Sequence, residues 1–342
     1  MYAGFALQRY DVAPLPFIPF SGTGGEALSN TGAVVGGMRN SDGSVSLAQW
    51  FQGRLTDLGG PPGLPSGDFN RPRVFGMSAS GTIVGTVHTA AGDLPSRPFV
   101  YDRERFTVLP LVNPTDLGGA AIGINSRGQV VGYRHIAHNR TRAWLWADGT
   151  YSSLPISGTN VVAFGINSSG AIVGNRTLGF FRRLLPGQFH CTGQRGYVLS
   201  QGAAVHLNGF VHAINDLGQA AGGSPADDAA MAAVFNNGIA TAILTLPSAA
   251  VGINSVADVV GFYNPAGCGS RRLFIWSANA GAFDLTPDGY RSAQAAAIND
   301  HGQVLGFGET PDGERPYFLL TPDPNGVLTP QPLMTARRAV AR

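Results

Sequence analysis

One short pattern recurs seven times along the chain and limits its possible folds more than any other feature. In the third copy it reads AIGINSRGQVVGY, from Ala121 to Tyr133. The last glycine of each copy is Gly36, Gly85, Gly132, Gly174, Gly222, Gly261 or Gly306, so successive copies lie 39 to 49 residues apart. A period of this length indicates similar supersecondary units arranged as a ring or a stack.

Each element of the pattern has a physical interpretation. Ile-Asn-x-x-Gly predicts a tight hairpin, because glycine enters the left-handed region without a Cβ penalty and the Asn side chain can bond the backbone two residues on. Ser29 and Ser78 replace the Asn in the first two copies. Ala257 replaces the turn glycine in the sixth, so we expect that hairpin to differ locally. The glycine of the return strand indicates a bulge or a close backbone approach.

Two further strands follow each hairpin. An aromatic strand such as RAWLWAD, Arg142 to Asp148, precedes a turn and a fourth short strand. Four antiparallel strands in about 45 residues are typical of a propeller blade. The residue before the Ile position is small in every copy, as expected where inner strands converge on an axis: Ala27, Gly76, Gly123, Gly165, Ala213, Gly252 and Ala297. The sequence therefore predicts an all-β, seven-bladed β-propeller with four antiparallel strands per blade.

The ends of the chain suggest how such a ring closes. An extra outer strand, RYDVAPLP from Arg9 to Pro16, precedes the first hairpin and could pair with the last blade. The segment PNGVLTPQPL, 324–333, competes for that place. We expect the N-terminal strand to close the ring, with 1–333 as a single propeller domain and 334–342 as a C-terminal tail.

Composition excludes several function classes. The chain has no lysine, so Schiff-base and Ser–Lys mechanisms are excluded, and a net charge of +2 makes nucleic acid an unexpected partner. No run approaches the roughly 20 apolar residues of a membrane span. The first residues, MYAGFALQRYDVAPLP, lack the basic and apolar regions of a signal peptide.

GINSRGQVVGY followed by RAWLW resembles the HAF-type repeat of many predicted bacterial extracellular proteins. The resemblance extends from Arg9 to about Leu320. It implies a β-propeller and export to an extracellular or periplasmic location, although the absence of a signal peptide leaves a cytoplasmic location open. It implies no catalytic residues.

The repeats also act as an internal control, because a polar residue that departs from its column is a candidate for function. Two positions before the motif Ile, the column reads Glu26, Phe75, Ile122, Phe164, His212, Val251 and Ala296. His212 and Glu26 are therefore candidate catalytic residues facing the channel. The alternative for His212 is a hydrogen-bonded core histidine.

A second set follows the return-strand glycines or enters a first strand, and we expect it at the mouth of the channel. Its candidate ligand-binding members are Arg73, His88, Arg134, His135, Arg176, Tyr263 and Glu309. Converging Arg and His side chains would favour a carboxylate, phosphate or sulfate. The alternative is solvated loop charge, and acidic residues on the same face, such as Asp116, dilute the field.

No metal site and no cofactor is predicted, because the HExxH, CxxC and calcium-loop motifs are absent. His135 and His138 share one loop, and His190 adjoins Cys191. Cys191 and Cys268 are compatible with a disulfide or with two free thiols.

Three functions fit these observations. The first is a monomeric recognition module that binds an anionic small molecule, glycan or protein at the loop face. The second is a lyase, isomerase or cyclase that uses His212 or another mouth histidine as general base, with Arg134 or Arg176 steadying the developing anion. The third is a structural surface protein.

Overall fold

Strands make up all of the regular secondary structure that the structure describes. The computed structural model describes residues 8–17, 26–61, 72–87, 96–137, 140–177, 194–226, 229–265, 270–327 and 333. Within these ranges the chain forms 28 β-strands and no helix. The predicted all-β class is confirmed.

Each repeat contributes four strands in chain order, except the seventh. The first two repeats supply β2 (Ala27–Leu28), β3 (Val34–Arg39), β4 (Val45–Phe51), β5 (Arg54–Gly59), β6 (Arg73–Met77), β7 (Ile83–Val87), β8 (Arg97–Asp102) and β9 (Arg105–Val108). The third and fourth supply β10 (Gly119–Ile124), β11 (Val130–Ala137), β12 (Arg140–Ala147), β13 (Thr150–Ser153), β14 (Asn160–Ile166), β15 (Ile172–Thr177), β16 (Gln194–Ser200) and β17 (Ala203–His206). The fifth and sixth supply β18 (Phe210–Ile214), β19 (Ala220–Ala226), β20 (Ala229–Asn236), β21 (Ile239–Ala242), β22 (Ser248–Ile253), β23 (Val259–Tyr263), β24 (Arg272–Ser277) and β25 (Gly281–Asp284). The seventh supplies β26 (Ser292–Ile298), β27 (Val304–Glu309) and β28 (Tyr317–Val327).

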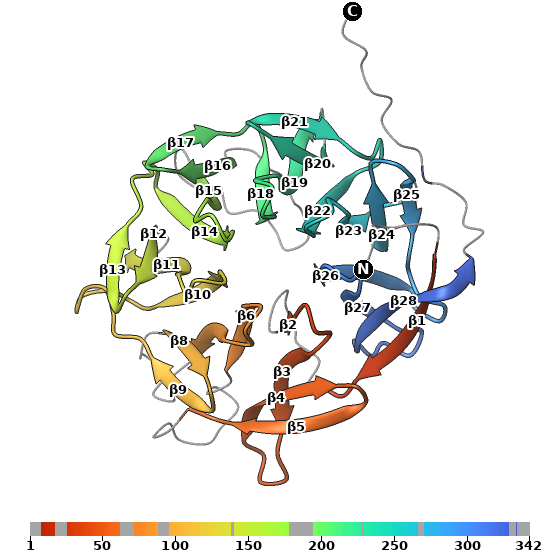
Figure 1. The fold of residues 1–342 in the computed structure, drawn as a ribbon, viewed down its shortest axis with the longest axis horizontal. Coiled ribbons are helices and arrows are strands. Elements are labelled where there is room, and N and C mark those ends of the chain that lie inside the picture. Colours follow the sequence, from red (N-terminus) through yellow and green to blue (C-terminus); the bar gives the residue numbers. More distant parts are fainter. Residues whose placement is uncertain are drawn as a thin grey trace, which may run out of the picture.

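These strands form six hydrogen-bonded sheets around a common centre (Figure 1). Five sheets have four strands, and the sixth has eight because it joins the third and fourth repeats. A single parallel pair, Thr141 opposite Asn160, connects the two halves of that sheet. The first strand of each repeat lies nearest the centre and the fourth lies at the periphery.

The N-terminal strand supplies the outer strand of the last sheet. β1 (Gln8–Leu15) pairs antiparallel with β28, from Leu15 opposite Tyr317 to Gln8 opposite Val327. The predicted N-terminal strand therefore takes this place, and the first four residues of the competing segment, 324–327, belong to its partner β28. Leu333, the one described residue beyond β28, donates its backbone N–H to the carbonyl of Ala282 in the sixth repeat at 2.8 Å.

The motif forms the predicted turn. In the third repeat Gly128 has a φ of 75°, and its N–H donates to the carbonyl of Asn125 at 3.1 Å. The expectation that the sixth hairpin differs is wrong. Ala257 adopts a φ of 66°, and its N–H makes the same 3.1 Å bond to the carbonyl of Asn254. The alanine therefore adopts a left-handed conformation that costs a residue other than glycine roughly 1 kcal/mol.

The return-strand glycine is required by close packing. A Cβ on Gly132 would lie 2.0 Å from the carbonyl oxygen of Ala120 on the paired strand and 2.8 Å from the Trp144 ring. Trp144 is only 1% exposed. The predicted close approach is confirmed, and the associated bulge lies on the first strand. The core itself fills the spaces between neighbouring repeats, as where Val173 of the fourth packs with Phe235 of the fifth.

Candidate functional site

The column that contains His212 is a set of bulge residues on the innermost strands, whereas Glu26, its counterpart in the first repeat, directly precedes β2. In six repeats the register between first and second strands skips one residue: Phe75, Ile122, Phe164, His212, Val251 or Ala296. All six are half-buried. Because these residues lie outside the backbone pairing between the first and second strands, their side chains can differ between repeats without disturbing the sheets. We call them the bulge column.

Neighbouring first strands approach each other closely beside this column. A Cβ on Gly76 would lie 2.7 Å from the carbonyl oxygen of Ile122 in the next repeat. A Cβ on Gly123 would likewise lie 3.0 Å from the carbonyl oxygen of Phe164. The predicted reason for the column of small residues, crowding of inner strands, is confirmed at these positions.

His212 lies among aromatic rings. Its imidazole is 5.7 Å from the ring of Phe164 in the preceding repeat and 5.3 Å from that of Phe210 on its own strand, both edge-on. Burial lowers the pKa of His212 to about 4. The imidazole is therefore neutral at pH 7, and it offers a ligand one N–H donor and one acceptor without a charge.

Glu26 has a different environment in the joint between the first and seventh repeats. Its side chain is buried, and its carboxyl is hydrogen-bonded to the hydroxyl of Tyr317 on β28. Burial raises the pKa of Glu26 to about 8, with a smaller opposing effect from the Tyr317 hydroxyl. The two predicted catalytic residues therefore engage separate neighbours and do not form one cluster.

The described members of the predicted ligand-binding set lie at the start of a first strand or in the later part of a second strand, and several have internal partners. Arg134 donates to the buried carboxylate of Asp116 at 2.7 Å. The Tyr263 hydroxyl donates to Asp284 at 2.9 Å, and Asp284 also pairs with Arg272. Glu309 accepts from Arg315 at 3.0 Å. These ion pairs and hydrogen bonds leave little net charge at those positions.

Arg176 and His135 contact neutral groups. Arg176 donates through Nη1 to the carbonyl and the hydroxyl of Ser157, at 3.1 and 3.2 Å, and its buried Nε has no hydrogen-bond partner among the described residues. His135 stacks edge-on with Tyr133 at 5.2 Å, and burial lowers its pKa. Arg73 begins β6, where its positive charge partly offsets the effect of burial on the pKa of Tyr133. His88 lies outside the described residues.

An arginine near the start of the third strand recurs in several repeats and bonds to its own repeat. Arg142 donates to the carbonyl of Gly158 at 2.8 Å, and Arg195 donates to the Asn208 side chain at 2.9 Å. Both acceptors follow a fourth strand. These arginines therefore hold the connection that leads to the next repeat.

Sequence reasoning missed the second role of the motif asparagine. Beyond its own turn, each Asn donates through Nδ2 to the backbone carbonyl of the equivalent residue in the next repeat. The bonds are Asn125 to Asn167, Asn167 to Asn215, Asn215 to Asn254, Asn254 to Asn299 and Asn299 to Ser29, at 3.0, 3.1, 3.0, 3.3 and 2.9 Å. We call this series the asparagine ladder. The sequence contained one signal for this role. Serine forms the same turn in the first two repeats, so the turn alone does not explain why the other five repeats have asparagine.

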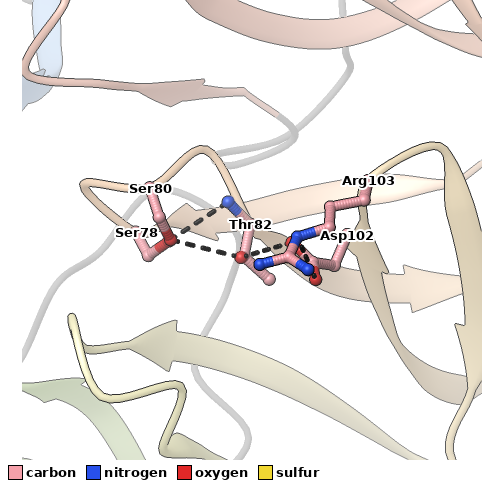
Figure 2. Close-up of polar contacts among 5 residues, drawn as sticks. All are labelled: Ser78, Ser80, Thr82, Asp102 and Arg103. Atoms are coloured by element: carbon pink, nitrogen blue, oxygen red, sulfur yellow. Dashed lines mark hydrogen bonds and ion pairs between the residues drawn. The ribbon is translucent and has the colours of Figure 1, made fainter.

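In the second repeat, Ser78 takes the place of the motif asparagine, and the polar contacts around it stay within that repeat (Figure 2). The Ser78 hydroxyl contacts that of Ser80 at 2.8 Å and accepts from the Thr82 N–H at 3.1 Å. Thr82 in turn donates to Asp102 at 2.9 Å. All four residues belong to one repeat, so this polar network stabilises its own sheet.

No group of three or more His, Cys, Asp or Glu side chains that could hold a metal ion occurs in the described residues. His138, His190, Cys191 and Cys268 lie outside them. In the same part of the chain, no helix is long and apolar enough to cross a membrane.

Comparison with known proteins identifies the fold. No family model matches the chain, and neither does any curated protein. Among solved structures, it is similar to the β-propeller domain of the Trilobed protease from Pyrococcus furiosus, whose topology is described as an open velcro. The identity is 14% and the TM-score 0.54, over 86% of this chain and 91% of that one. The fold is a β-propeller.

Two peptidases are also similar to this propeller. They are the acylaminoacyl peptidase of Pyrococcus horikoshii (12% identity, TM-score 0.55) and a puromycin-hydrolyzing peptidase of Mycobacterium tuberculosis (12%, 0.57). The matches cover 87% and 94% of this chain but 51% and 56% of those chains. The chain thus spans about half the length of these peptidases, and at such identities the likeness extends to the fold alone.

Proposed function

We propose that this chain is a closed seven-bladed propeller that works as a rigid recognition module, binding an anionic ligand at its loop face. Counting the eight-stranded sheet as two blades is supported by its single connecting pair. Closure between the first and last repeats is supported by the β1–β28 pairing and by two side-chain contacts. Asn299 bonds the Ser29 carbonyl, and Asn30 donates to Asp300 at 2.7 Å.

The environment of Arg176 is the main support for an anionic ligand. It lies on the loop face, its Nη1 donates to a carbonyl and a hydroxyl, and in the part of the chain that the structure describes its Nε has no hydrogen-bond partner. Arg134 and Arg315, by contrast, are already bonded to carboxylates. A carboxylate, sulfate or phosphate group on a small molecule, glycan or protein would supply the missing counter-charge.

The test is a screen of carboxylated, sulfated and phosphorylated small molecules and glycans by thermal shift, followed by titration of the best probe. Arg176→Gln should weaken its binding at least tenfold. Arg103→Gln is the matched control, because Arg103 is exposed on a β8–β9 turn at the other end of the strands. Equal affinity for all three proteins would reject Arg176 as the anion contact.

The enzyme alternative receives less support from the geometry. A pKa of about 4 makes His212 a poor general base at neutral pH, where an effective base has a pKa near the working pH. Arg134, one proposed anion stabiliser, is neutralised by Asp116. Export remains a proposal that rests on the repeat resemblance, and fractionation of the native host would test it.

A further inference from the structure

The Glu26–Tyr317 contact lies at the joint between the first and the seventh repeats. Glu26 directly precedes β2, the first strand of the first repeat. Tyr317 begins β28 and pairs with Leu15 of the N-terminal strand on one side and with Phe307 of β27 on the other. The contact therefore joins the first repeat to the sheet that contains both the first and the last strand, β1 and β28.

The surroundings of this contact are apolar. Tyr317 is 1% exposed and packs in a cluster with Leu15, Phe17, Val34, Ala48, Leu305 and Leu319. Glu26 lies against Gly36, where an added Cβ would be 3.1 Å from the Glu26 Cγ and 2.9 Å from the Phe17 ring. A carboxylate in such surroundings loses hydration, so the neutral acid is favoured.

Charged neighbours do not compensate for this burial. The other titratable side chains described on the elements packed here are Tyr10 and Asp11 of β1, Arg39 at the end of β3, Arg73 at the start of β6, Glu309 at the end of β27 and Asp323 of β28. Burial raises the pKa of Glu26 to about 8, and the Tyr317 hydroxyl acts in the opposite direction by a smaller amount. No cation among the described residues therefore stabilises an ionised Glu26.

We propose that Glu26 and Tyr317 form a proton-dependent switch at this joint. The neutral carboxyl is accommodated in the apolar joint between the first repeat and the sheet that contains β1 and β28. Ionisation loosens the joint, because the buried carboxylate has lost its hydration. This role is independent of any ligand at the loop face.

The direction of the pH effect follows from linkage. The folded pKa, about 8, lies above the value of 4.5 for a solvated glutamate. The stabilisation is therefore complete below about pH 4.5, decreases as the pH rises, and levels off above about pH 8. Between these limits the opening constant of the joint should rise about tenfold per pH unit.

Hydrogen exchange of the full chain tests this switch, comparing the wild type with Glu26→Gln, an uncharged side chain of the same shape. Peptides that cover β1 and β28 report on the joint, and peptides that cover β22 and β23 of the sixth repeat serve as the internal control. The ratio of wild-type to variant opening constants in β1 and β28 should rise about a hundredfold between pH 5.5 and 7.5. It should stay constant in the control peptides.

A ratio that does not change with pH would overturn the proposal, as would an equal change in the control peptides. Should Glu26→Gln fail to fold, Tyr317→Phe provides a second test. It removes the hydroxyl that lowers the pKa of Glu26, so the opening constant should level off at a higher pH than in the wild type. An unchanged levelling point would also reject the switch.

Discussion

The third to seventh repeats of this propeller stabilise the motif hairpin with an asparagine, whereas the first two stabilise it with a serine. In the third to seventh repeats an asparagine stabilises its own hairpin and also donates to the next repeat. In the first two, Ser29 and Ser78 stabilise the hairpin only: in the described residues, their hydroxyls bond within their own repeat. A difference of one amide group thus separates a local turn from a connection between sheets.

Asn167 shows how much one such side chain does. Its Oδ1 accepts from the Ala171 N–H and the Ser169 hydroxyl, both at 2.8 Å, while its Nδ2 donates to Asn215. A second connection runs beside it, since the Ser168 N–H donates to Asp216 at 2.8 Å. The last bond of the ladder, from Asn299 to the Ser29 carbonyl, joins the seventh repeat to the first. The ladder therefore stops at the first of the two serine repeats.

The largest expected effect comes from removing one member of the ladder. Asn167→Ala should lower the free energy of unfolding by about 2 to 4 kcal/mol, because the Asn215 carbonyl and the Ala171 N–H lose their side-chain partner in buried surroundings. Urea denaturation of the purified chain measures this loss.

Ser78→Ala is the matched variant in the other group of repeats. It removes only bonds within one partly exposed hairpin, so a loss of about 1 kcal/mol is expected. Equal losses for the two variants would show that the inter-repeat bond adds nothing, and the comparison would fail.

The repeat pattern predicted the architecture well because each of its elements answers a local requirement. Turn glycines, the return-strand glycine and the small residues beside the axis all reflect backbone geometry, which recurs in each repeat. Ala257 misled the prediction, since its neighbours impose the turn in spite of the missing glycine.

The candidate site was predicted less well, because its properties depend on partners far away in the sequence. Arg134 looked like a free cation until Asp116 was placed beside it. Glu26 looked like a channel acid, but Tyr317, almost 300 residues later, draws it into the joint. Columns locate unusual residues, whereas only the fold shows what surrounds them.

A gain in stability should follow from converting a serine repeat to the asparagine type. Ser78→Asn would place an amide donor beside the next repeat, where the equivalent carbonyl is that of Asn125. We expect an increase of about 1 kcal/mol in the free energy of unfolding. Ser78→Asp is the control, because aspartate can accept the turn bonds but, when ionised, has no donor for that carbonyl. A gain shared by both variants would place the effect in the turn and contradict an inter-repeat bond.

The smallest expected effect concerns the one turn among the asparagine repeats that has no glycine. Ala257 has a φ of 66° in a position that is glycine in the other copies, and Asn254 still makes its ladder bond to Asn299 at 3.3 Å, the longest of the five. Ala257→Gly relieves the left-handed strain but adds freedom to the unfolded chain, so a net gain of about 0.5 to 1 kcal/mol is expected. Val256→Gly, one residue earlier and without a positive φ, has no strain to relieve and should instead be neutral or destabilising. If Ala257→Gly also fails to stabilise the protein, the alanine is not strained, and the sixth repeat is as well adapted to the ladder as its neighbours.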